Sequence, residues 1–391
     1  MKIMKGRKKL LAITLVLSII LSLPVLAADT TKAGKGGVLE YDEIKQRVLD
    51  ENLQLKSAQA AMHKISNNIS DKDRKDAEDA LYGAYYSTNG VLESLKEIIQ
   101  GASSPEIKVI ANAAAVSLEM TVRNFTAQID SLDESFGALE DQLDFSKSSF
   151  EQAQVSLANT AQNMFVLYHQ LDNNLKKLEK SRNQLADQLA LVNKNIELGL
   201  AAKIDALDLE TSLLELDASR TSLLHQKDAL LLQLKGFIGL TYKDELALGE
   251  MPDAEKSFID SIEFEKDLDS AVENAKSIKT KELEMKNSSI TGNQRKYELQ
   301  IKEQDAALAF TKKYHTLVEA KDQLLVSESK LKAAELKLGK GRISREIGQI
   351  SESQLNTLLN EVETLRLEVK TNSASLFIET ENYKAMKAGM L

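Results

Sequence analysis

Residues 195–210 read NIELGLAAKIDALDLE and separate two runs of apolar residues. The run before this stretch consists of Leu171, Leu175, Leu178, Leu185, Leu189, Val192 and Ile196. The run after it consists of Leu209, Leu213, Leu216, Leu223, Leu230, Leu234 and Phe237. Arg182 interrupts the first run, and Arg220 and Lys227 interrupt the second. Alternating steps of four and three residues are typical of helices that pack on other helices, so we predict a long helix on each side.

Gly199 lies between the two runs and can end the first helix. Glycine adopts the left-handed conformation of a helix terminus without a side-chain clash. Asp205 can then cap the second helix by accepting a hydrogen bond from a backbone N–H. The stretch is therefore predicted to be the tip of a long antiparallel helical hairpin.

A second stretch, ELKLGKGRIS at Glu335–Ser344, carries Gly339 and Gly341 between two further apolar runs. The run before it consists of Leu317, Ala320, Leu324, Ser327, Leu331, Ala334 and Leu338. The run after it consists of Leu355, Leu358, Val362, Leu365 and Val369. We predict a second hairpin with its tip at these glycines, and two such hairpins suggest an internal duplication.

Several stretches of the chain resemble the TolC family of efflux outer-membrane proteins. The likeness is carried by LGLAAKID (198–205), QLKGFIGL (233–240), VLEYDEIKQRVLDENLQL (38–55) and AVENAKSIKTKELEM (271–285). At the second predicted tip the chain departs from the family pattern, because Ser344 stands where an aspartate is expected. The resemblance implies an all-α core of two repeated antiparallel coiled-coil hairpins with little or no β structure.

The family crosses the outer membrane through β-strands placed between the helices of each repeat. Such strands alternate apolar and polar residues over about ten positions. Helix-forming residues occupy 65–149 instead, and 279–313 has no room for two strands. We therefore expect a chain that keeps the helical conduit, lacks the barrel strands and is not an integral membrane barrel. An uninterrupted helix from Pro105 to Ile196 is expected to be about 140 Å long.

The expected organisation has five parts. They are a signal peptide at 1–28, a flexible lead-in at 29–39, a first hairpin repeat at 40–240, a linker at 241–257 with room for a short strand or helix, and a second hairpin repeat at 258–391. Five cations precede an apolar run at 10–23 and the small residues Ala27 and Ala28. The run is shorter than the roughly 20 residues of a spanning helix, which favours a cleaved secretory signal over an uncleaved anchor.

Composition excludes several functions. Removing the signal takes five cations and no acid, so the formal net charge of −9 becomes −14, which disfavours nucleic acid as a partner. The sequence has no cysteine, and its four histidines are far apart. No phosphate-binding loop or nucleophile motif is found. We expect no enzymatic activity, no cofactor and no metal site.

The tips are the candidate functional sites, and the candidate residues are Gly199, Lys203, Asp205, Gly339, Lys340 and Arg342. Turn formation, capping and solubility account for all six. The resemblance adds that family tips close the conduit entrance and contact a periplasmic adaptor. Tyr82, Tyr85 and Tyr86 form a further cluster that suits either helix packing or an interfacial anchor.

Two functions follow from these observations. The first is a secreted, envelope-associated efflux or export component, a trimer whose hairpins form an α-helical conduit and dock a membrane-fusion adaptor and an inner-membrane pump. The second is a coiled-coil scaffold or spacer of the cell envelope that does not transport.

Overall fold

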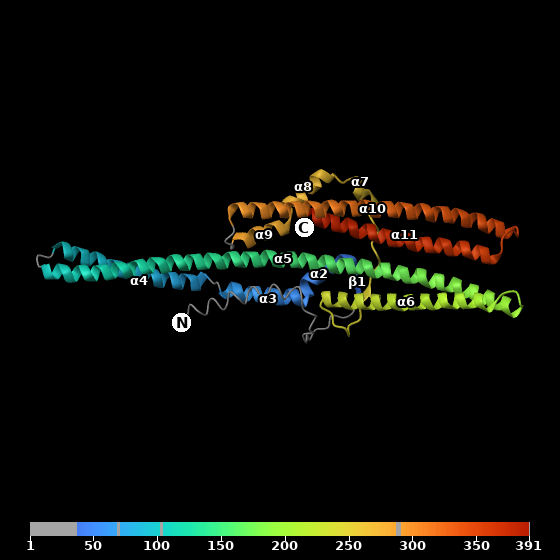
Figure 1. Ribbon diagram of the computed structural model, residues 1–391, viewed down its shortest axis with the longest axis horizontal. Coiled ribbons are helices and arrows are strands. Elements are labelled where there is room, and N and C mark those ends of the chain that lie inside the picture. The colour runs from blue at the N-terminus through green and yellow to red at the C-terminus, as the bar shows by residue number, and fades with distance from the viewer. Residues whose placement is uncertain (1–36, 69–70, 102–104, 287–290, 391) are drawn as a thin grey trace. The chain divides into compact units, whose positions relative to one another are not determined.

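A computed structural model describes residues 37–68, 71–101, 105–286 and 291–390. The described chain is almost entirely helical, as predicted (Figure 1). Its helices are α2 (Tyr41–Glu51), α3 (Leu53–Asn68), α4 (Asp71–Gly101), α5 (Pro105–Glu197), α6 (Lys203–Phe237), α7 (Lys256–Asp260), α8 (Phe264–Asn274), α9 (Lys276–Lys286), α10 (Gly292–Glu346) and α11 (Glu352–Lys387). Its strands are β1 (Val38–Leu39) and β2 (Ala247–Leu248). The predicted signal peptide lies outside the described residues.

The chain divides into two compact units, each built from segments of both halves of the sequence. Among the described residues, the first unit contains 57–151 and 279–297, and the second contains 37–56, 152–278 and 298–390. In the first unit, α9 contacts α5 through a hydrogen bond between the hydroxyl groups of Ser148 and Thr280, 2.7 Å apart. The tyrosine cluster lies on α4, where the rings of Tyr82 and Tyr86 stack at 6.2 Å and both side chains are exposed.

The second unit holds residues 152–197 of α5 with α6, and residues 298–346 of α10 with α11, which form the tip-bearing parts of the two hairpins (Figure 1). The predicted apolar seams are its core. Leu171 and Leu175 of α5 are buried, as are Leu230 and Leu234 of α6. In the other hairpin, a buried cluster is formed by Ala334, Leu338 and Val362. Apolar burial between paired helices, rather than helix propensity alone, stabilises these long helices.

The three cations that interrupt the first seam form ion pairs between α5 and α6. The pairs are Arg182–Asp217, Arg220–Glu179 and Lys227–Asp172. Arg182 donates from Nε to Oδ1 of Asp217 at 2.6 Å, and this hydrogen bond lowers the pKa of Asp217 below its ordinary value. At these three positions the helices pair through charged groups at the edge of the apolar seam. Each pair joins one residue of α5 to one residue of α6 and so favours a single alignment of the two helices.

A two-stranded parallel sheet joins the beginning of the described chain to the linker. Val38 pairs with Ala247 and Leu39 with Leu248, and the Gly249 N–H donates to the Leu39 carbonyl at 2.9 Å. Leu39 is fully buried. The flexible lead-in predicted to extend to residue 39 is therefore wrong at its last two residues. The segment 241–257 contains β2, and α7 begins at its last two residues.

The helical part of the chain that begins at Tyr41 is interrupted at Asn52, between α2 and α3. The Asn52 carboxamide oxygen accepts from the N–H groups of Gln54 and Leu55, both at 3.0 Å, and so caps α3. Its Nδ2 donates to the Phe237 carbonyl at 3.0 Å. One asparagine thus starts a new helix and holds the end of α6 against it.

Candidate functional site

The first tip is a glycine-terminated turn at the predicted position. Helix α5 ends at Glu197, and Gly199 has a φ of 73°. The Leu200 N–H donates to the Asn195 carbonyl at 2.8 Å, and the Gly199 N–H donates to the Ile196 carbonyl at 3.0 Å. This hydrogen-bond pair defines a Schellman motif, which requires the left-handed conformation at its glycine.

Asp205 caps α6 from inside the first turn of the helix rather than from the position before it. Helix α6 begins at Lys203, and one Asp205 carboxylate oxygen accepts from the Ala202 N–H at 3.1 Å. The carboxylate also lies at the positive end of the helix dipole. The predicted hydrogen bond from a backbone N–H to Asp205 is therefore present, and the N–H belongs to Ala202, three residues before Asp205.

The second tip has the same construction around Gly348, whose φ is 79°. The Gln349 N–H donates to the Ser344 carbonyl at 2.7 Å, and the Gly348 N–H donates to the Arg345 carbonyl at 3.0 Å. The hydroxyl of Ser351 accepts from the Gln354 N–H at 3.2 Å, and the Gln354 side chain accepts from the Ser351 N–H at 2.8 Å. These two hydrogen bonds form a capping box.

The prediction that the second tip lies at Gly339 and Gly341 is wrong. Both glycines, together with Lys340 and Arg342, lie inside α10, which continues to Glu346. A Cβ at position 341 would come within 2.4 Å of a methyl group of Leu358 on α11, so this glycine permits close helix packing. Glycine costs only about 1 kcal/mol in a helix interior, which this packing offsets.

A sequence signal for the true tip exists in the residues after Gly348. Ser351 and Gln354 have the S-x-x-Q spacing of a capping box, and a glycine precedes them at the position that ends a helix. The prediction placed the tip at GKGRIS because this stretch has two glycines, although no capping box follows them. A cap and a glycine together locate a turn better than glycine alone.

Substitutions at Gly348 and Gly339 should show which of these two glycines lies in the second turn. Gly348→Val should destabilise the turn by about 1–3 kcal/mol, because a β-branched residue resists a positive φ. Gly339→Ala should be neutral or stabilising by up to about 1 kcal/mol, because helix α10 then gains a better helix former. Urea unfolding monitored by circular dichroism measures both changes. Equal destabilisation by the two changes would contradict the position of the turn.

Both tips expose large apolar side chains beside charged ones. At the first tip, Leu198, Leu200 and Ile204 are 64%, 75% and 59% exposed. At the second, Ile343 and Ile347 are 61% and 64% exposed. Lys203 and Asp205 are also exposed, as are Gly339, Lys340 and Arg342 further back on α10. Exposed apolar groups at the end of a hairpin are typical of a surface that another protein covers.

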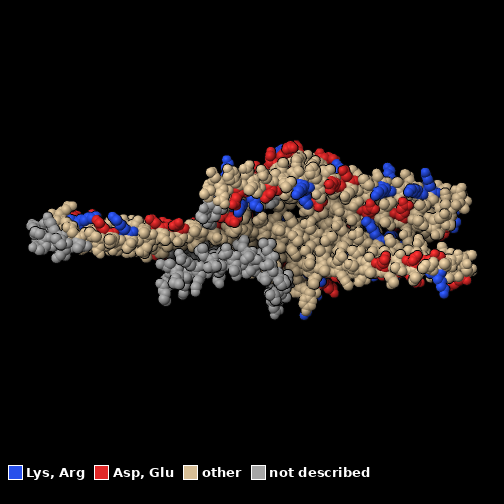
Figure 2. Space-filling view, viewed as in Figure 1, with Lys and Arg blue, Asp and Glu red and all other residues tan. Residues whose placement is uncertain are grey.

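The two hairpins contact each other through polar side chains of α5 and α11. Gln170 donates to Ser375 at 2.9 Å, and Asn382 donates to Asn163 at 3.4 Å. Nearer the tips, Lys180 and Glu363 form an ion pair at 3.7 Å. Acidic and basic side chains are interspersed along the arms that carry the tips (Figure 2). Such contacts exchange readily for contacts with water, so they resist separation less than the apolar seams do.

No group of three or more His, Asp or Glu side chains in the described residues is placed to bind a metal ion. His169 packs on Phe165, with ring centroids 4.8 Å apart, and burial lowers its pKa below the ordinary value. It is a packed histidine of α5. In the part of the chain that the structure describes, no helix has the length and apolar character needed to cross a membrane.

One solved outer-membrane channel shares this fold, and two others are similar to the chain. The Campylobacter jejuni CmeC outer membrane channel superimposes over 95% of this chain and 94% of its own length, with a TM-score of 0.51 and 10% identity. CusC covers 90% of this chain and 96% of its own length at a TM-score of 0.48 and 12% identity. The outer-membrane channel OprN covers 95% and 99% at 0.48 and 12%. No protein-family model and no curated protein matches the sequence.

Proposed function

We propose that this chain, which has the fold of the TolC-family efflux channels, is a component of an envelope-spanning efflux or export system. Copies of the chain, most simply three, assemble into an α-helical conduit. The tips at Gly199 and Gly348 form its entrance and dock a membrane-fusion adaptor, which connects the conduit to an inner-membrane pump. The chain is extracytoplasmic, associated with the cell envelope and not an enzyme.

Exposed apolar residues at heptad spacing carry this proposal. On α6, Leu207 and Leu214 are seven residues apart and are 54% and 71% exposed. On α10, Leu336 and Ile343 are again seven apart and are 64% and 61% exposed. Each hairpin therefore has an inner seam that is buried within the chain and, near its tip, a pair of exposed apolar residues one heptad apart. Exposed apolar residues at this spacing favour packing against a further helix, such as one from a second copy of the chain.

The repeated construction of the tips supports a common role for them. Both turns use the same Schellman hydrogen bonds, and both following helices are capped by the third residue of their first turn. We attribute this correspondence to an internal duplication of hairpin repeats at 40–240 and 258–391 joined by the linker at 241–257. In a ring of such chains, every hairpin would present the same kind of tip, as a circular entrance requires.

Hydrodynamic measurements test the conduit. The purified protein should sediment as a closed oligomer at micromolar concentration, and the double variant Leu336→Gln with Ile343→Gln should sediment as a monomer with unchanged helix content. Both side chains are exposed in the single chain, so their replacement leaves its own core intact. Lys332→Gln, on an exposed part of the same helix, is the matched control and should keep the oligomer.

Site-specific crosslinking from Leu200 to a membrane-fusion adaptor encoded with the protein is the second readout. The parent oligomer should capture the adaptor, and the monomeric double variant should not, because docking needs several tips at once. A monomeric parent would refute the conduit. An oligomer that captures no adaptor would favour the envelope scaffold.

A further inference from the structure

Two tyrosine rings on α4, in the first unit, form an exposed aromatic surface. The rings of Tyr82 and Tyr86 have centroids 6.2 Å apart and planes inclined by 25°, and the two side chains are 40% and 67% exposed. Tyr85 meets Tyr86 edge-on, with ring centroids 5.3 Å apart, which restricts the rotation of the Tyr86 ring. An exposed ring that is held in this way offers an apolar face on which a flat ligand can stack.

Two glycines leave the space beside Tyr86 open. Gly83 stands three residues before Tyr86 and Gly90 four residues after it, a spacing that places all three on one face of α4. A Cβ at either glycine would meet nothing within 4 Å among the described residues. Glycine is unfavourable in a helix interior, and here the packing of the chain does not offset that cost. A molecule that lies against this face would use the space that the glycines leave.

Polar side chains stand at both ends of the ring pair. The positions from Asp79 to Asn89 follow each other in steps of three, four and three residues, with the two tyrosines in the middle, so they share one face of α4. Asp79 is exposed and Asn89 is half-buried. A carboxylate accepts hydrogen bonds, and a carboxamide both accepts and donates them. A ligand that lies along the rings can therefore form hydrogen bonds at both of its ends.

The charge around the rings favours an uncharged ligand. The segment 80–92 contains no charged residue, although 28% of the residues of the chain are charged. Exposed acids stand on both sides of this segment, Asp79 before it and Glu97 after it, and the next cation after it, Lys96, is paired with Glu93 at 2.9 Å. Nucleic acids and anionic lipid surfaces bind clustered cations, so both are disfavoured here. A second copy of α4 would bring like charges together at both ends of the face.

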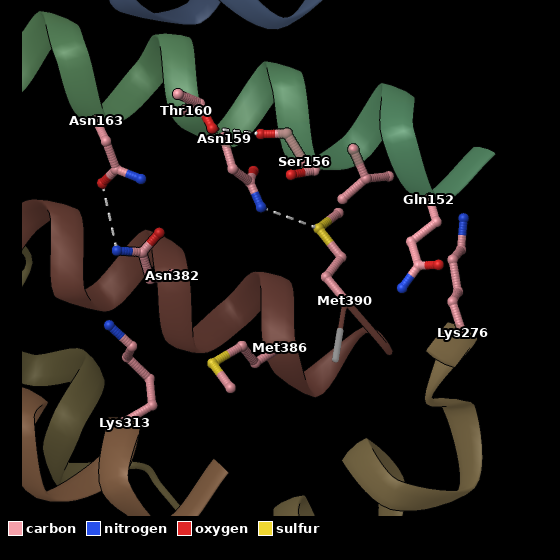
Figure 3. Close-up of a pocket in the computed structure, with 11 residues that line it drawn as sticks. Gln152, Ser156, Asn159, Thr160, Asn163, Lys276, Lys313, Asn382, Met386 and Met390 are labelled. Atoms are coloured by element: carbon pink, nitrogen blue, oxygen red, sulfur yellow. Dashed lines mark hydrogen bonds between the residues drawn. The ribbon is translucent and has the colours of Figure 1, made fainter. Parts of the chain in front are cut away.

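The cavity of about 410 Å³ in the second unit is a less favourable ligand site than this face (Figure 3). In its lining, Lys313 forms an ion pair with Glu379 at 2.7 Å. Asn382, also in the lining, donates to Asn163 at 3.4 Å. These polar groups are bound within the chain, whereas the tyrosine rings on α4 are open to solvent.

We propose that the face of α4 from Asp79 to Asn89 binds a linear, uncharged glycan of β-1,4-linked pyranose units. The flat face of a pyranose carries C–H groups that stack on aromatic rings, so two consecutive units lie on Tyr82 and Tyr86. The 6.2 Å between the ring centroids is similar to the length of one such unit. Hydroxyl groups of the glycan form hydrogen bonds with Asp79 and Asn89. The site lies on one helix of one chain, so it does not depend on the proposed conduit.

Isothermal titration calorimetry of the purified protein with two glucose hexamers tests the site. Cellohexaose has an extended chain, and maltohexaose has the same units in a curved chain. We expect cellohexaose to bind more tightly, because only an extended chain lies on both rings at once. Tyr82→Ala and Tyr86→Ala should each weaken the binding of cellohexaose about five- to tenfold, and Tyr86→Phe should keep it. Tyr242→Ala removes a tyrosine that is 69% exposed outside this face and should leave the binding unchanged.

A glycine variant separates this role from helix stability. Gly83→Leu with Gly90→Leu fills the open space, so it should raise the urea midpoint of unfolding and still weaken the binding of cellohexaose. Equal binding of the two hexamers, undiminished binding to Tyr82→Ala with Tyr86→Ala, or no binding of cellohexaose to the parent would overturn the proposal. Cosedimentation of the parent, but not of Tyr86→Ala, with phosphatidylcholine vesicles in the absence of any cellohexaose binding would overturn it in favour of a membrane contact.

Discussion

Gly239→Ala should lower the free energy of unfolding by roughly 3–5 kcal/mol, far more than the same change at Gly199. The two glycines have nearly identical backbone conformations, with φ values of 74° and 73°. They differ in their surroundings. A Cβ at position 239 would lie 2.5 Å from the carbonyl oxygen of Glu51, whereas a Cβ at 199 meets nothing within 4 Å. The positive φ costs about 1–2 kcal/mol at either site, and the clash adds the rest at position 239 only.

Urea unfolding of the two single variants, at equal protein concentration, isolates the clash because the conformational cost is common to both. The neighbouring atom is backbone at the junction of α2 and α3, so it cannot rotate away as a side chain would. Similar midpoints for the two variants would show that Glu51 is not packed against Gly239. Gly389 offers the corresponding test in the other half, since a Cβ there would lie 2.2 Å from the carbonyl oxygen of Asn274.

The first hairpin was predictable because three independent signals coincide at one point. The heptad runs reverse there, Gly199 ends one helix and Asp205 caps the next. At the second hairpin the runs were recognisable, but a packing glycine, Gly341, resembled a turn glycine. Glycine serves both purposes for the same reason, the absence of a Cβ. The opposite helix, here through Leu358, distinguishes them in the structure, and the capping box after Gly348 distinguishes them in the sequence.

Features that depend on distant residues were not predictable. The break at Asn52 has neither glycine nor proline, and its second hydrogen bond reaches the end of α6. Two-residue strands are too short to show alternation, so Val38 and Leu39 looked like part of a lead-in. The seam interruptions at Arg182, Arg220 and Lys227 were visible, but their acidic partners could be assigned only from the opposite helix.

Asp267→Ala should cost roughly 2–4 kcal/mol of stability, because it removes the acceptor of a buried hydroxyl group. Asp267 is 4% exposed and accepts from the Tyr383 hydroxyl at 2.9 Å and from Lys387 Nζ at 2.6 Å. Tyr383 is fully buried among aromatic rings, with its centroid 4.9 Å from that of Phe310. Burial, followed by the hydrogen bond to Asp267, raises the pKa of Tyr383 above its ordinary value, so the hydroxyl stays protonated and needs an acceptor.

A double-mutant cycle identifies the cause of this loss. Tyr383→Phe alone leaves Asp267 paired with Lys387 and should cost about 1 kcal/mol. In the Asp267→Ala background, the same change removes the unsatisfied hydroxyl, so the double variant should be less destabilised than the two single losses together by about 1–2 kcal/mol. Urea unfolding of the four proteins measures this coupling. Additive losses would mean that the two side chains stabilise the end of α11 independently, through packing alone.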